Sequence, residues 1–233
     1  MQSYAGQPAP VIALDGPAGS GKSTVARRVA TELGLRYLDT GAMYRALTWW
    51  LQRNAVDLTD TAAVLARIAE PQIAIGTDPG APQVTVDGKD VAADIRTREV
   101  SNSVSAVAAI PQVRQLLIGM QRDIIAAAVA DGAGIVAEGR DIGTVVAPDA
   151  AVKVYLTATE DVRAQRRSAD LAADPTATVD MTRREQALRD QRDAAQMAMA
   201  DDAVRIDTSG LGQDDVVRRV VAMARKRQAV PHG

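Results

Sequence analysis

The chain has 233 residues, with 27 Lys and Arg against 29 Asp and Glu, and 47% of its residues are apolar. These values exclude a wholly disordered chain, a collagen-like repeat and a coiled coil, and the net charge of −2 gives no electrostatic footprint for a nucleic-acid partner. Cys is absent and the one His is the penultimate residue, so disulfides, thiolate nucleophiles and Cys-ligated zinc are excluded.

Short apolar runs alternate with helical patterns along the chain. Residues 11–14 predict a buried parallel strand, and residues 22–33 predict a helix that Gly34 would cap at its C-terminus. Further strands are predicted at 36–38, 134–137, 152–156 and 204–206, and further helices at 114–130, 160–167, 181–197 and 214–225. About five strands joined by helical crossovers predict a three-layer α/β fold with a parallel sheet.

Two segments interrupt this alternation. Residues 71–94 show a period-2 pattern broken by turn residues, which predicts a small antiparallel insert. Residues 169–180 are polar and rich in small side chains, a composition that favours a mobile lid.

The longest apolar run, residues 124–130, is far shorter than the roughly 18 residues of a membrane span, and the first 14 residues carry no Lys or Arg. We therefore expect a cytoplasmic chain with no membrane partner.

Residues 16–23 read Gly-Pro-Ala-Gly-Ser-Gly-Lys-Ser and fit the phosphate-loop pattern Gly-x-x-x-x-Gly-Lys-Ser/Thr. The match lies between a predicted strand and a predicted helix, as its mechanism requires, because the helix N-terminus presents unpaired N–H groups to a phosphate. Lys22 is expected to reach the β- and γ-phosphates, and the Ser23 hydroxyl to ligate Mg²⁺. The pattern predicts binding of ATP or GTP. The candidate nucleotide-binding residues are Gly16, Pro17, Ala18, Gly19, Ser20, Gly21, Lys22, Ser23 and Thr24.

A phosphate loop alone leaves three classes open: small-molecule kinases, switch GTPases and mechanical ATPases. The Asn-Lys-x-Asp motif of GTPases is absent, because none of the four lysines follows an Asn. No apolar strand ends in the Asp-Glu pair of many ATPases, and Glu138 is the nearest candidate. A kinase remains, and an acceptor that is itself a phosphate would need no general base, because its oxygen is already ionised.

Four blocks of sequence resemble the bacterial cytidylate (CMP) kinases. They are residues 16–24, Leu-Asp-Thr-Gly-Ala-Met-Tyr-Arg at 38–45, Ile-Arg-Thr-Arg-Glu-Val at 95–100, and Glu-Gly-Arg-Asp-Ile-Gly-Thr-Val-Val at 138–146. The resemblance extends in order from about residue 11 to residue 227. It implies a P-loop kinase fold with a five-stranded parallel sheet, a small antiparallel insert and a helical lid. It also implies one domain over residues 1–233, with a CMP-side insert at 71–105 and a lid region at 160–190.

The resemblance further implies site residues. Lys22, Arg140 and Arg189 are the catalytic candidates. For substrate binding the candidates are Asp39, Thr40, Arg45, Ser105, Arg114, Arg140, Asp141 and Asp193, with Ser23 on the metal. In this assignment Thr40, Arg45 and Arg140 hold the CMP phosphate, and Ser105, Arg114 and Asp141 read cytosine. A carboxylate accepts from the exocyclic amine of cytosine and repels the uracil carbonyl.

The match to the family changes after Asp193. Arg189, Asp190 and Asp193 fit the family pattern Arg-Asp-x-x-Asp-Ser-x-Arg, which implies Arg189 on the transferring phosphate and Asp193 on the ribose hydroxyls. Gln196 stands in place of the last arginine, the family's Ser-Pro-Leu is missing, and the link to the strand at 204–206 is shorter. Either the site has one cation fewer, or Arg192, one turn earlier, replaces the lost arginine.

The leading interpretation is a monomeric kinase that transfers the γ-phosphoryl group of ATP to CMP or dCMP with Mg²⁺. A kinase of another small molecule is an alternative, in which Asp39 or Asp141 would deprotonate a hydroxyl acceptor. A nucleotide-binding regulatory module without transfer activity is a further alternative, favoured by Gln196.

Overall fold

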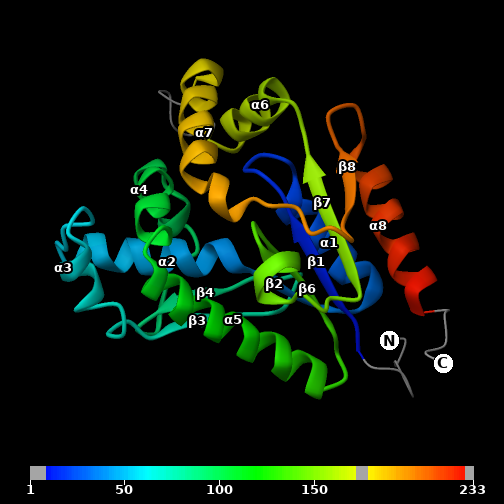
Figure 1. Cartoon of the computed structure of the whole chain (residues 1–233), viewed down its shortest axis with the longest axis horizontal. Helices are drawn as coiled ribbons and strands as arrows, with labels where there is room; N and C mark the ends of the chain where they lie inside the picture. Colours follow the sequence, from blue (N-terminus) through cyan, green and yellow to red (C-terminus); the bar gives the residue numbers. More distant parts are fainter. Residues whose placement is uncertain (1–8, 172–177, 229–233) are drawn as a thin grey trace.

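A parallel sheet forms the centre of the computed structural model, which describes residues 9–171 and 178–228 (Figure 1). Its five strands are β1 (Val11–Asp15), β2 (Arg36–Asp39), β6 (Ile135–Gly139), β7 (Val152–Thr157) and β8 (Val204–Asp207). They pair in the order β2-β6-β1-β7-β8. The register sets Asp15 beside Gly139 on one side and Tyr155 on the other, so the carboxyl ends of the three central strands meet at one edge. The five predicted strands and the parallel sheet are confirmed.

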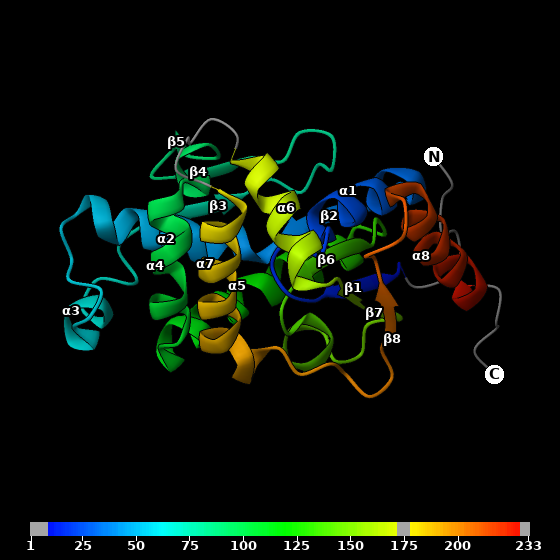
Figure 2. The same ribbon diagram turned by 90° about the horizontal axis from the view of Figure 1, so that it is seen from above.

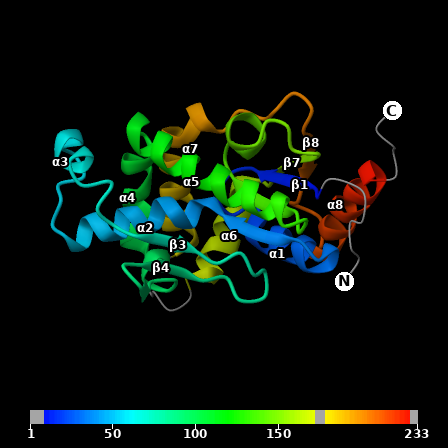
Figure 3. The same ribbon diagram turned by 90° about the horizontal axis from the view of Figure 1, so that it is seen from below.

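Helices cover both faces of this sheet, because side chains along its buried strands alternate between two apolar cores. Ile12 and Leu14 of β1 point to a core with helices α1 (Lys22–Leu33) and α8 (Gln213–Gln228). Ala13 points to the opposite core, which includes α2 (Thr40–Arg53) and α5 (Pro111–Ala130). In the view from below, α5 lies across the sheet (Figure 3). This is the predicted three-layer arrangement.

The predicted antiparallel insert is confirmed as a second, small sheet. It consists of β3 (Ile73–Ile75), β4 (Val84–Val86) and β5 (Lys89–Asp90). Val84 and Val86 are buried in the same core as α2. The carbonyl of Thr77 accepts the N–H of Tyr37 at 2.9 Å, so the segment after β3 covers the free edge of the parallel sheet at β2.

The helices α4 (Arg98–Ala108), α7 (Val179–Asp193) and α6 (Glu160–Asp170) lie side by side, with α7 in the middle and α4 farthest from the parallel sheet (Figure 2). A short helix, α3 (Thr61–Leu65), precedes the insert. The three remaining turns of helix are η1 (Asp94–Arg96), η2 (Ile142–Val146) and η3 (Ala194–Gln196). None of the described helices is both long and apolar enough to span a membrane.

The prediction of one helix over residues 181–197 is wrong at its C-terminal end. Helix α7 ends at Asp193, and a single 3-10 turn follows. The carbonyl of Met197 accepts the hydroxyl of Tyr155 at 3.1 Å, and Asp202 pairs with Lys153 at 2.9 Å. These contacts hold the short link beside β7, and this path is incompatible with a continuation of helix α7. Of the predicted lid at 169–180, residues 172–177 lie outside the described part of the chain.

Candidate active site

The phosphate loop connects the end of β1 to the start of α1, as the sequence predicts. Gly16 has φ 143° and Gly19 has φ 77°, values that favour glycine. A Cβ on Gly16 would lie 2.1 Å from the carbonyl oxygen of Leu156, and one on Gly19 would lie 2.9 Å from that of Arg163. The side chain of Lys22 folds back over the loop and donates to the carbonyl of Pro17 at 2.8 Å.

Glu138 lies at the carboxyl end of β6, opposite Leu14 of β1 and close to the loop. Its Oε2 accepts the hydroxyl of Ser23 at 3.0 Å, and its Oε1 accepts the hydroxyl of Tyr37. Burial, together with repulsion from Asp39, raises the pKa of the Glu138 carboxyl above its ordinary value. Sequence reasoning weighed Glu138 only as part of an ATPase motif. Its place at a strand end beside the phosphate loop was the signal that could have assigned it to this site.

Several cations converge beside the phosphate loop. Burial lowers the pKa of the Lys22 ammonium, and repulsion from Arg140 lowers it further. Burial also lowers the pKa of the Arg189 guanidinium to about 9, with Arg140 as the next cause. Like charges gathered away from water destabilise one another, and a bound polyanion would relieve that repulsion. The cluster therefore suits phosphate groups.

The phosphate loop, these cations and the predicted substrate residues line one cavity of about 950 Å³. The predicted site residues among its lining are Ala18, Gly19, Gly21, Lys22, Ser23, Thr24, Asp39, Thr40, Arg45, Ser105, Arg114, Arg140, Asp141, Arg189 and Asp193. The other three, Gly16, Pro17 and Ser20, are loop residues that do not line it. The structure thus brings together side chains from both halves of the chain.

Asp39 and Thr40 stabilise the start of α2 beside the cavity. The Oδ1 of Asp39 accepts the N–H of Ala42 at 2.9 Å as an N-cap, and its Oδ2 pairs with Arg45 at 2.8 Å. The hydroxyl of Thr40 donates to the carbonyl of Glu138 at 2.7 Å. These bonds give both residues a structural role and orient Arg45 at the cavity wall.

The cavity lining also holds an ion pair between Arg114, in the first turn of α5, and Asp141, just after β6. Ser105 of α4 is buried nearby on the cavity wall, and its hydroxyl has no hydrogen-bond partner among the described residues. Burial raises the pKa of the neighbouring Tyr44 hydroxyl to about 12, so Tyr44 is neutral at physiological pH. This part of the lining therefore offers a carboxylate, a guanidinium and a hydroxyl to a flat polar ligand.

Asp15, which sequence reasoning missed, fixes the loop that carries Arg140 and Asp141. Its two carboxylate oxygens accept the N–H groups of Ile142 and Gly143, each at 2.8 Å. Asp15 is 6% exposed, and this burial raises its pKa to about 6. The only sequence signal was a carboxylate at the end of the first strand, and its partners lie more than a hundred residues away.

We expect the stability contributed by Asp15 to depend on pH. Because its folded pKa lies above that of the unfolded chain, the contribution is full below about pH 4 and is lost as the pH rises through about 6. From pH 8 down to about 4.5, the wild type should gain about 2 kcal/mol of unfolding free energy relative to Asp15→Asn. Urea unfolding of both proteins at several pH values measures this difference, with the exposed Asp131→Asn as a control. Parallel pH curves for wild type and Asp15→Asn would contradict the expectation.

The structure separates the two explanations offered for Gln196. Gln196 lines the cavity, whereas Arg192 is exposed on α7 and is not among the lining residues. The hypothesis that Arg192 replaces the lost arginine is therefore not supported, and the structure favours a site with one cation fewer.

Comparison with known proteins identifies the family. Residues 12–226 match the model of the family described as cytidylate kinase. The chain belongs to the cytidylate kinase family. It is 48% identical to the cytidylate kinase of Streptomyces avermitilis over 223 residues, 95% of each chain. It is also 48% identical to that of Nocardia farcinica over 220 residues, 91% of this chain and 93% of the relative.

Other proteins that match this chain are less similar to it. A bifunctional pantoate ligase/cytidylate kinase of Synechococcus elongatus is 44% identical over 229 residues, which are 94% of this chain and 42% of that protein. The structure of shikimate kinase from Acinetobacter baumannii in complex with shikimate is 15% identical, with a TM-score of 0.49, and the match covers 98% of this chain and 99% of that one.

Proposed function

We propose that the chain transfers the γ-phosphoryl group of ATP to CMP or dCMP, giving ADP and CDP or dCDP. The observation that carries this proposal is that the phosphate loop and the Arg114–Asp141 pair line the same cavity. Partly buried cations, Lys22 and Arg189, also line it. Membership of the cytidylate kinase family supports it. The cytoplasmic location and the monomeric state stay predictions from the sequence.

On the donor side, the phosphate loop and Lys22 would bind the triphosphate of ATP. The Ser23 hydroxyl and the Glu138 carboxylate, 3.0 Å apart, would hold Mg²⁺, because this cation prefers oxygen ligands. A cation there also favours the ionised form of Glu138, whose pKa burial raises. When bound, Mg²⁺ would neutralise charge on the β- and γ-phosphates.

On the acceptor side, Thr40, Arg45 and Arg140 would hold the CMP phosphate. One of its oxygens attacks the γ-phosphorus, and the bond from that phosphorus to the β-phosphate oxygen breaks to release ADP. The acceptor oxygen is already ionised, so no general base is required. Arg189, partly buried and close to Arg140, would balance the charge of the phosphoryl group in transit.

Cytosine would be read by the Arg114–Asp141 pair and Ser105 in the cavity lining. The Asp141 carboxylate would accept from the exocyclic amine of cytosine, and Arg114 and Ser105 would donate to its ring acceptors. Uracil presents a carbonyl where cytosine has the amine, so it would face a carboxylate without a donor.

ADP release from ATP, with each nucleoside monophosphate offered separately, tests this function. We expect CMP and dCMP to give far higher rates than UMP or AMP. Equal turnover of UMP would contradict the assignment of Ser105, Arg114 and Asp141 to cytosine. A nucleotide-binding module without transfer activity is the second candidate, because Gln196 lines the cavity at the position of a family arginine. No ADP with any acceptor would favour that candidate.

A further inference from the structure

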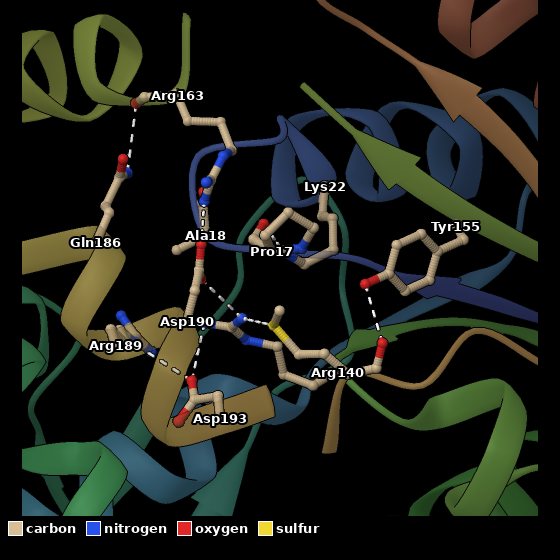
Figure 4. Close-up of polar contacts among 11 residues, drawn as sticks. Pro17, Ala18, Lys22, Arg140, Tyr155, Arg163, Gln186, Arg189, Asp190 and Asp193 are labelled. Atoms are coloured by element: carbon tan, nitrogen blue, oxygen red, sulfur yellow. Dashed lines mark hydrogen bonds and ion pairs between the residues drawn. The ribbon is translucent and has the colours of Figure 1, made fainter. Parts of the chain in front are cut away.

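An ion-pair network joins the helices α6 and α7 to both loops that would hold phosphates (Figure 4). Asp190 of α7 lies at its centre. The Oδ2 of Asp190 accepts the Nη1 of Arg163 at 2.5 Å, and its Oδ1 lies 3.4 Å from the Nη1 of Arg140. Asp193, one turn later, pairs with the Nη2 of Arg140 at 3.0 Å. Asp190 is thus shared by two arginines from different parts of the fold.

Arg163 connects this network to the phosphate loop. It lies on α6, is 6% exposed, and its Nη1 also donates to the carbonyl of Ala18 at 3.3 Å. Gln186 of α7 donates to the Arg163 carbonyl at 3.3 Å, which fixes the backbone of α6 beside Gly19. Arg163 does not line the cavity, so it supports the loop and does not face a substrate.

The ion-pair network requires the negative charge of Asp190. A buried guanidinium is strongly destabilising without a carboxylate partner, and Asp190 is the carboxylate that the structure places on Arg163. Asp190 also lies outside the residues that line the cavity, so its effect on substrates is exerted through other side chains.

We propose that Asp190 is a positioning residue that holds Arg140 at the acceptor phosphate and, through Arg163, holds the phosphate loop at the donor. The proposal rests on the proposed function, which assigns Arg140 to the CMP phosphate. Because one carboxylate serves both loops, its loss disturbs donor and acceptor together. A residue that merely joined α6 to α7 would affect stability alone.

The chain offers a matched control between the same two helices. Arg183 of α7 pairs with Asp161 of α6 at 2.9 Å; this pair is more exposed than that of Asp190, and neither of its residues lines the cavity. The variant Asp161→Asn removes this ion pair, whereas Asp190→Asn removes the buried one at similar cost in volume. The two variants separate loss of an α6–α7 ion pair from loss of the contact to the loops.

We expect Asp190→Asn to raise the KM for CMP and the KM for ATP, each by about tenfold, and to lower kcat, because charge-assisted hydrogen bonds are lost on both sides. Asp161→Asn should keep all three constants within about twofold of wild type. Titration calorimetry with ADP alone should show about tenfold weaker binding to Asp190→Asn and unchanged binding to Asp161→Asn. The calorimetry needs no acceptor, so it tests Asp190 even if the chain proves to use a substrate other than CMP.

Wild-type KM values and ADP affinity in a folded Asp190→Asn variant, with only a lower Tm, would overturn the proposal. If that variant does not fold, Asp190→Glu takes its place, because it keeps the charge and displaces the carboxylate by one methylene. We then expect a folded protein with raised KM for both substrates. Wild-type constants in Asp190→Glu would overturn the proposal.

Discussion

Replacing Lys22 with Ala should lower kcat for phosphoryl transfer by about 10²- to 10³-fold, because a preorganised cation at the developing charge is lost. The fold should survive, since burial and the neighbouring Arg140 already lower the pKa of the Lys22 ammonium. An ionised Lys22 therefore destabilises the folded chain when no substrate is bound, and replacing Lys22 with Ala removes this destabilisation.

ADP release at saturating ATP and CMP measures this effect, and circular dichroism checks the fold. Lys226→Ala, on the exposed end of α8, is the matched control and should keep the wild-type rate. A folded Lys22→Ala variant with near-normal kcat would show that the phosphate loop does not take part in transfer.

Replacing Asp141 with Asn should relax base choice more than it slows transfer. The amide of Asn can turn a donor toward the uracil carbonyl, and a base contact of this kind is worth about 1–3 kcal/mol. The ratio of kcat/KM for CMP to that for UMP should fall by about 10- to 100-fold. The loss of the ion pair with Arg114 should weaken binding of both nucleotides, since that guanidinium is partly buried and loses its carboxylate.

Parallel kinetics with CMP and UMP measure the ratio for the wild type, for Asp141→Asn and for the exposed Asp149→Asn, which should behave as wild type. An unchanged ratio in Asp141→Asn would assign Asp141 to orientation of Arg114 alone.

Local patterns were enough to predict most of the fold. The apolar run at 11–14, the glycine-rich loop and the apolar spacing of 22–33 each act over a few residues, and the structure confirms β1, the loop and α1. The helix predicted to reach residue 197 ends at Asp193, because Tyr155 holds the Met197 carbonyl beside β7. A helical pattern contains no information on such a tertiary contact.

The candidate site was also predictable only in part from local sequence patterns. The predicted residues that line the cavity belong to short motifs, so their grouping could be expected from the family resemblance. The roles of Asp15, Glu138 and Asp190 depend on partners 127, 115 and 50 residues away in the chain. Strand register and the packing of α6 against α7 create those contacts, and neither is visible in the spacing of the residues involved.

Phosphorus NMR of the chain with equimolar ATP and CMP and excess Mg²⁺ tests most directly whether the cavity holds donor and acceptor together for one transfer. We expect the signals of ADP and CDP to grow in step, with no inorganic phosphate. Inorganic phosphate growing in place of CDP, or unchanged ATP and CMP beside a folded chain, would contradict phosphoryl transfer from ATP to CMP.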